Sequence, residues 1–278
     1  MIHPEKIEDQ SKLCVHTQTN KPWSLRQCVE HYHGAGIKGI SIWRHLLEEI
    51  SFEDARRLLN DHNMDVVSLV RGGFFPSTNA KNRLRAIEDN LLAIEQAEAI
   101  GAPLLVLVGG SDPLQSLEVS REQIRDGIQE ILPHAERAGI KLAIEPLHPM
   151  YAADRSAITT ICQANDMAGE ISSDYLGVAV DVFHLWWDPA LQKEIMRCGR
   201  MDKLFAFHVC DWNVPLKDMF SDRGLMGDCC INLKEIRGWM EEAGFNGYRE
   251  VEVFSDKYWA MDQLEYLDKI RNAYMNFT

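Results

Sequence analysis

Short runs of apolar residues alternate along the chain with longer segments in which apolar residues recur every three to four positions. An uninterrupted short apolar run is typical of a buried strand, and the longer spacing is typical of an amphipathic helix. The pattern predicts eight strand–helix pairs. The expected strands are 12–17, 37–42, 65–70, 103–109, 140–145, 176–181, 203–209 and 248–253.

Polar caps and glycines mark the ends of the predicted helices. Ser24 can cap the helix before the second strand, and Gly34 or Gly36 can end it in a left-handed conformation. Eight such pairs fit a closed α/β barrel, which takes about 250 residues as one domain, better than an open doubly wound sheet. We therefore predict a single (β/α)8 TIM barrel over residues 1–278, in which 1–11 form a short N-terminal extension.

Composition excludes several classes of protein. The chain is 46% hydrophobic, without a linker or low-complexity segment, and its formal charge of −13 disfavours nucleic acid as a partner. The amino end lacks the basic and apolar regions of a secretory signal, and nowhere do about 18 apolar residues follow one another to span a membrane. The seven cysteines have no disulfide-framework or zinc-ribbon spacing. We expect a cytoplasmic enzyme with reduced thiols.

Four consecutive predicted strands end in side chains that bind metal ions. These side chains are Glu145, Asp181, His208 and Glu252. Active sites of such barrels lie at the carboxyl ends of the strands, where neighbouring strands would bring the four together. Each alone could be a helix cap or a core histidine, but together they would repel one another without a cation or protons. Three carboxylates and one imidazole suit Mn²⁺, Mg²⁺ or Co²⁺ better than a thiolate-type zinc site does.

Residues two positions before the strand ends point to the same side of the barrel. Three of them are small, namely Ala143, Ala179 and Ala206, as expected beneath a site. The fourth is Glu250, a second charged residue with the same inward direction as Glu252. Nothing in the sequence gives a physical reason for it.

The order of motifs is similar to that of a known family. IEP, VDVFH, FHVCDW, DRGLMGD and VEVF follow one another within residues 140–255. This order resembles the xylose isomerase-like superfamily, and more narrowly its sugar phosphate isomerase/epimerase family, which includes ketose 3-epimerases, hydroxypyruvate isomerases and inosose dehydratases. The first half of the chain matches only in its pattern of strands and helices.

The resemblance implies one divalent cation held by the four strand-end residues. Mn²⁺ is the expected ion, with Mg²⁺, Co²⁺ and Zn²⁺ as alternatives. The resemblance further implies that His184 and Arg223 contact substrate oxygens, and that Glu145 and Glu252 exchange protons as well as bind the ion. A small-molecule sugar would be the substrate, and the family's barrels commonly associate, so a homo-oligomer is expected by analogy.

Other candidates lie at the ends of the first strands and in two loops. His16, Trp43 and Arg71 end strands one to three and could line the mouth of the site and select the substrate. His148 stands between two prolines and is either a rigid site residue or a turn residue. The segment 211–231 is long for a connection in a barrel, which is typical of a lid.

Three reactions remain compatible with these residues. The first is isomerisation or epimerisation of a ketose by proton transfer beside a carbonyl, through an enolate that the metal stabilises. The second uses the same site but eliminates a leaving group, as a lyase or dehydratase acting on a keto-sugar, keto-glycoside or keto-inositol. The hydride shift of true xylose isomerases is disfavoured, because it needs a second metal and no further carboxylate cluster matches it.

The third is the phosphodiesterase chemistry of AP endonucleases, which share the barrel and the spacing from Asp181 to His184. Those enzymes use three zinc ions and need extra histidines after early strands, which 107–112 does not supply. The charge of −13 also opposes DNA binding. A barrel without activity is the last alternative, and the presence of all four ligand types argues against it.

Overall fold

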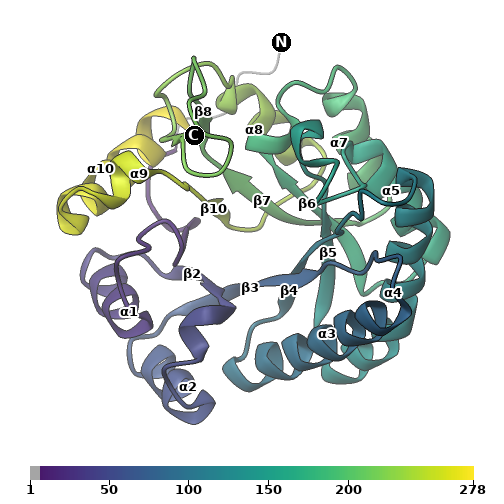
Figure 1. The fold of residues 1–278 in the computed structure, drawn as a ribbon. Coiled ribbons are helices and arrows are strands. Elements are labelled where there is room, and N and C mark those ends of the chain that lie inside the picture. The colour runs from purple at the N-terminus through teal and green to yellow at the C-terminus, as the bar shows by residue number, and fades with distance from the viewer. Residues whose placement is uncertain (1–6) are drawn as a thin grey trace.

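The computed structural model describes residues 7–278, so the first six residues of the predicted N-terminal extension lie outside the described residues. Eight parallel strands form a closed barrel in the order β1-β10-β7-β6-β5-β4-β3-β2 (Figure 1). The prediction of a (β/α)8 barrel is thereby confirmed. The strands are β1 (Leu13–His16), β2 (Gly39–Trp43), β3 (Asp65–Gly73), β4 (Leu104–Val108), β5 (Lys141–Glu145), β6 (Leu176–Asp181), β7 (Leu204–Val209) and β10 (Arg249–Val251).

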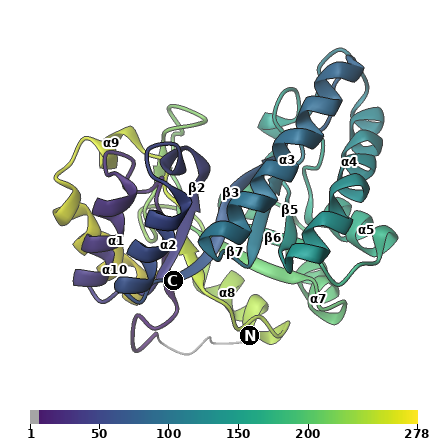
Figure 2. The same ribbon diagram turned by 90° about the horizontal axis from the view of Figure 1, so that it is seen from below.

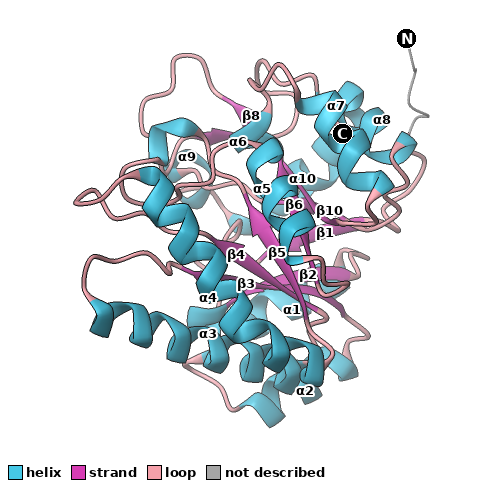
Figure 3. Ribbon diagram, turned by 90° about the vertical axis from the view of Figure 1, so that its right-hand side faces the viewer, coloured by secondary structure: helices cyan, strands magenta, loops and turns pink. Residues whose placement is uncertain are grey.

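Helices surround the barrel on the outside, as the views from below and from the side show (Figures 2 and 3). None of those in residues 7–278 is long and apolar enough to cross a membrane. The long helices are α1 (Leu25–Gly34), α2 (Phe52–Asp61), α3 (Ala80–Ile100), α4 (Leu117–Ala138), α5 (Ile161–Ile171), α7 (Leu191–Arg200), α8 (Leu233–Glu242) and α10 (Gln263–Phe277). Four short helical turns, η1 (Arg44–Leu47), η2 (Pro149–Tyr151), α6 (Val182–Leu185) and α9 (Asp256–Trp259), stand in connections that follow barrel strands.

Local sequence sets the boundaries of these elements. Ser24 caps α1 and forms a reciprocal capping box with Gln27, and Gly36 after the helix has a φ of 75°, a left-handed value that glycine adopts without strain. Strand β3 continues to Gly73, beyond the predicted end at residue 70, because its register against β4 shifts between Val70 and Gly72.

The interior of the barrel is filled by small and apolar side chains below the carboxyl ends of the strands. Their neighbours along the strands, such as Leu142 and Val178, belong instead to the main core between the barrel and the helices. Residues alternate in direction along a strand, so the polar strand-end residues stand above the interior cluster. That cluster consists of Ala143, Ala179, Ala206, Val70, Leu104 and Val106.

The connection after β7 folds into a small structure of its own. Two short strands, β8 (Asp211–Trp212) and β9 (Arg223–Gly224), pair in antiparallel fashion. The Asp211 carboxylate accepts backbone hydrogen bonds from Cys229 at 2.8 Å and Ile231 at 2.9 Å, which fastens the far end of the loop. The pairing of β8 with β9 holds Arg223, the first residue of β9, above the carboxyl ends of the barrel strands.

Candidate active site

The four strand-end residues meet at the carboxyl end of the barrel. Glu145 ends β5, Asp181 ends β6, His208 lies in β7, and Glu252 directly follows β10. Each offers one ligand atom, and these atoms lie within 4.8 Å of one another. All four side chains are buried. The cluster has the geometry that the sequence predicts, while its role in binding an ion stays a prediction.

The contacts inside this cluster fit a hard divalent cation. His208 Nδ1 lies 2.9 Å from Glu145 Oε1, yet neither atom has a well-aligned hydrogen-bond partner among residues 7–278, as expected of two ligands directed at a common third point. Burial first, and then the charges of Glu252 and Glu145, raise the pKa of Asp181 to about 7. A cation among these carboxylates would relieve both the burial cost and the repulsion.

The carboxylates around His208 raise the pKa of its imidazole. Burial alone lowers the pKa of its imidazole, but the close contact with Glu145 and the charges of Glu250 and Glu252 outweigh burial and raise it to about 10. The imidazolium thus supplies part of the positive charge that a cation would bring. Binding of a metal must displace that proton.

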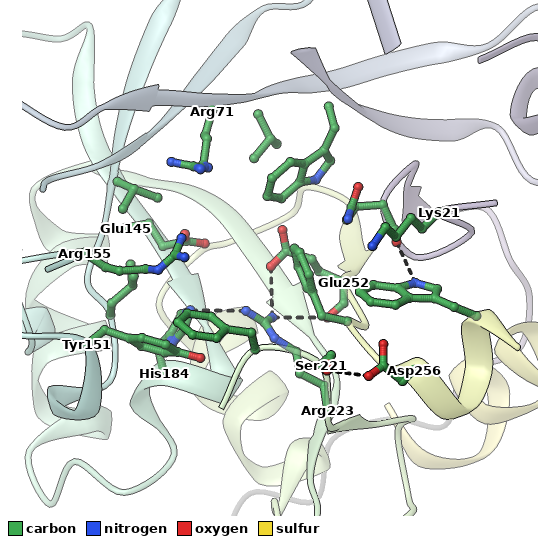
Figure 4. A pocket seen from close by; sticks show the side chains of 18 of the residues that line it. Lys21, Arg71, Glu145, Tyr151, Arg155, His184, Ser221, Arg223, Glu252 and Asp256 are labelled. Atoms are coloured by element: carbon green, nitrogen blue, oxygen red, sulfur yellow. Dashed lines mark hydrogen bonds and ion pairs between the residues drawn. The ribbon is translucent and has the colours of Figure 1, made fainter. Parts of the chain in front are cut away.

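Arg223 bridges two members of the cluster, and Figure 4 shows its contact with one of them, Glu252. Its Nη1 donates to Asp181 Oδ2 and to Glu252 Oε2, both at 3.0 Å, and its guanidinium stands 4.4 Å from the Phe183 ring centre. Burial lowers the pKa of Arg223, but the two carboxylates outweigh burial and raise it. Arg223 lines the cavity, as its predicted contact with substrate requires, and it also balances two ligand charges.

His184 lies beside this guanidinium and is neutral. Arg223 Nη2 stands 3.3 Å from His184 Nε2, which as an unprotonated nitrogen can accept a hydrogen bond. Burial, followed by the charge of Arg223, holds the pKa of His184 well below its usual range. The predicted substrate residue is therefore an uncharged hydrogen-bonding group in the cavity wall.

A second polar layer lies beneath the cluster and accounts for Glu250. Its Oε2 accepts from Ser41 Oγ at 2.5 Å and from Ser68 Oγ at 3.1 Å, and it lies 3.2 Å from His16 Nε2. His16 Nδ1 lies 3.1 Å from Glu252 Oε1, so the imidazole connects the two glutamates of β10. His16 was expected at the mouth of the site. It is instead fully buried below it, because these two carboxylates hold its ring inside the barrel.

His16 also belongs to an alternative group of ligands. His16, His208 and Glu252 offer atoms within 4.8 Å of one another, and the two imidazole rings lie 4.7 Å apart. The two groups share His208 and Glu252.

A cavity of about 460 Å³ opens above the cluster, large enough for a small-molecule ligand. The predicted residues Trp43, Arg71, His184 and Arg223 line it. His148 does not, because its side chain accepts a hydrogen bond from the Met150 backbone at 3.2 Å. Of the two roles considered for His148, the structure supports the turn residue.

Sequence reasoning missed several residues of the cavity wall. Arg155 and Tyr151 reach it from the connection after β5, Lys21 from the connection after β1, and Trp259 from the short helix α9. Tyr151 donates a hydrogen bond to the Met219 carbonyl, so the connection after β7 is fastened to that after β5. Only the position of these residues in loops after strands could have indicated them, and many other polar loop residues share that position.

Known proteins resemble this chain in sequence over most of its length. The sequence model of the xylose isomerase-like TIM barrel family matches residues 29–270. An inosose isomerase of Bacillus velezensis is 25% identical over 266 residues, which cover 90% of this chain and 91% of the relative.

Two solved structures share the fold over nearly the whole chain. A protein of Sinorhizobium meliloti 1021 is 41% identical, with a TM-score of 0.94 over 97% of this chain and 99% of the other. The IolI protein, solved with a bound zinc atom, is 21% identical, with a TM-score of 0.85 over 95% and 97% of the two chains. The similarity to the IolI protein, at 21% identity, is a similarity of fold alone.

Proposed function

Because the chain belongs to the xylose isomerase-like TIM barrel family, we propose that it is a metal-dependent isomerase or epimerase of a keto-sugar or keto-polyol. The observation that carries the proposal is the convergence of four buried ligands on one point below the cavity. A curated relative is named inosose isomerase, which makes cyclic keto-polyols candidate substrates together with open ketoses.

The cation supplies one part of the chemistry. Held by Glu145, Asp181, His208 and Glu252, it would polarise a ketone and the adjacent hydroxyl and so acidify the carbon-bound proton between them. Mn²⁺ is our proposed ion, because three of the four ligands are carboxylates. A zinc ion, as in the IolI structure, is the alternative.

Two carboxylates of the chain move the proton. Glu145 lines the cavity, so its carboxylate is placed to remove a proton from a bound substrate. Burial raises the pKa of Glu252, but the charges of His16 and Arg223 hold it well below its usual range. His16 Nδ1 lies 3.1 Å from Glu252 Oε1, so it can supply the proton that Glu252 returns.

Arg223 and His184 orient the substrate. The remaining N–H groups of Arg223 can donate to hydroxyl or carbonyl oxygens, and neutral His184 can donate or accept. Both groups are at least nine-tenths buried, so their bonds to substrate would form away from water and hold its reacting carbon near Glu145.

Hydrogen exchange in deuterated water tests the proposal. The Mn²⁺-loaded protein is incubated with ketohexoses and with keto-inositols, and proton NMR follows the carbon next to the carbonyl. We expect deuterium at that carbon together with an isomer or epimer, and neither product after metal removal with EDTA. Loss of water or of an aglycone would assign the site to the lyase alternative. Absence of exchange on every ketose, with metal bound, would contradict the proposal.

A further inference from the structure

Two guanidinium groups on one wall of the cavity have no carboxylate partner among residues 7–278. Arg71 lies in β3 and Arg155 in the connection after β5, and both line the cavity. Within the part of the chain that the structure describes, no carboxylate lies at ion-pair distance from either. Arg155 Nε is buried without a hydrogen-bond partner there. By contrast, Arg44 nearby contacts Asp89 at 2.8 Å.

The two guanidiniums are held in the same way. Arg71 stacks on the Phe74 ring at 4.2 Å and Arg155 on the Phe220 ring at 4.4 Å. An aromatic ring against one face of a guanidinium holds this planar group in position. The N–H donors along its edge then stay available to a ligand. An arginine edge matches the two oxygens of a carboxylate or phosphate. Phe220 belongs to the connection after β7, so two loops cooperate in placing Arg155.

The electrostatics of this wall are incomplete without an anion. Burial and then the charge of Arg155 lower the pKa of Arg71, and the charge of Glu145 is the largest influence that opposes them. Two like charges in a partly buried wall repel each other, and an anion between them would remove that cost. The protein as a whole is strongly acidic, with a charge of −13, so this pair is a local feature and not part of a basic surface.

Figure 4 shows where the pair lies relative to the cluster. Arg71 and Arg155 stand on the Glu145 side of the pocket, whereas Lys21 and Asp256 stand on the opposite side. A substrate whose ketone lies at the cluster can therefore extend another of its groups towards the two arginines.

We propose that Arg71 and Arg155 form a subsite for an anionic group, a carboxylate or a phosphate, on the keto-sugar that the cluster processes. The inference rests on the proposed function and narrows its substrate to acidic keto-sugars or keto-sugar phosphates. It separates this chain from a relative named for a neutral cyclic ketone.

Binding to the metal-free protein tests the subsite without the chemistry. Isothermal titration in EDTA compares D-fructose, D-fructose 6-phosphate and D-fructuronate, in which the sixth carbon carries a hydroxyl, a phosphate or a carboxylate. We expect at least one anion to bind about 10–100-fold more tightly than D-fructose, and Arg71→Gln and Arg155→Gln each to reduce this preference. Preference for one of the two anions identifies which of them the subsite takes.

Arg125→Gln is the matched control, because it removes the same charge from an arginine of α4 that pairs with Asp126 at 3.1 Å and does not line the cavity. It should leave the preference unchanged. Equal binding of the three sugars, or a preference that survives in both cavity variants, would overturn the subsite. Exchange of a neutral ketose in deuterated water together with equal binding would overturn the subsite alone. Anion binding without exchange on any ketose would overturn the function and leave the subsite.

Discussion

The two walls of the cavity differ in how their charges are balanced. On one wall Arg223 is shared between Asp181 and Glu252, at 3.0 Å from each. On the other wall Arg71 and Arg155 have no carboxylate partner within residues 7–278. The first wall is held by contacts within the folded chain, whereas the proposed subsite leaves the second to be completed by a ligand.

Substitutions in the two walls should change the free energy of unfolding by different amounts. Removal of one partner from a buried ion pair leaves the other charge without compensation, and this typically costs about 3–5 kcal/mol. Removal of an arginine that has no carboxylate partner within residues 7–278 leaves no carboxylate there without its counter-charge. Four changes, taken from the largest expected effect to the smallest, test this difference and the proposed chemistry.

Glu145→Gln should lower turnover by about 10²–10⁴-fold, because the amide cannot accept the proton that the carboxylate removes. Steady-state kinetics on the substrate identified by deuterium exchange would measure the loss. The free energy of unfolding of the metal-free protein should fall as well, because the substitution removes the buried charge that lies 2.9 Å from His208 Nδ1. Turnover at the wild-type rate would show that the proton carrier has been misassigned.

Glu250→Gln should reduce the free energy of unfolding by about 3–5 kcal/mol, because it removes the charge that faces His16 in a fully buried layer. Urea denaturation followed by circular dichroism measures this. Glu53→Gln, at an exposed position of α2, is the control and should shift stability by less than about 0.5 kcal/mol. Equal, small effects of both variants would mean that the lower layer does not stabilise the barrel.

Affinity for Mn²⁺ should increase with pH, because the ion must displace a proton from His208, whose pKa is about 10. Below pH 7 a second proton, that of Asp181 with a pKa of about 7, must also leave. Affinity should therefore rise about tenfold per pH unit above pH 7 and more steeply below it. Mn²⁺ titrations between pH 6 and 9 measure how affinity changes with pH. An affinity that does not change with pH would contradict the assignment of these two ligands.

Arg155→Gln should change the free energy of unfolding by less than about 1 kcal/mol, since only its stacking on Phe220 is lost. Thermal and urea unfolding of this variant beside Glu250→Gln give the comparison directly. A loss as large as that of Glu250→Gln would show that Arg155 has a structural role that its contacts do not reveal.

The barrel and its ligand cluster are predictable from sequence for a simple reason. Strands of a parallel barrel are buried on both faces, so they appear as apolar runs, and their ends are where polar residues interrupt them. Glu145 and Asp181 are found by that rule alone. The roles of Glu250 and His16 are not, because Glu250 contacts Ser41 and Ser68, which are 209 and 182 residues away and lie on other strands.

The residues of the cavity wall cannot be predicted from the sequence, for a related reason. Arg155 is placed by its contact with Phe220, a residue of a different connection, and neither residue belongs to a regular pattern. His148 shows the opposite case, because two neighbouring prolines suggest a rigid site residue where the structure has a turn. Contacts between loops depend on the closed barrel, which brings distant connections together, and the sequence of one loop carries no sign of them.

Titration of the metal-free protein with Mn²⁺, followed by electron paramagnetic resonance, tests the central claim that the cluster of Glu145, Asp181, His208 and Glu252 holds one cation. We predict one ion per chain, an affinity at least about 100-fold weaker in Asp181→Asn, and an unchanged affinity in Arg155→Gln. Three ions per chain, no bound ion, or equal affinity in the wild type and Asp181→Asn would contradict the account.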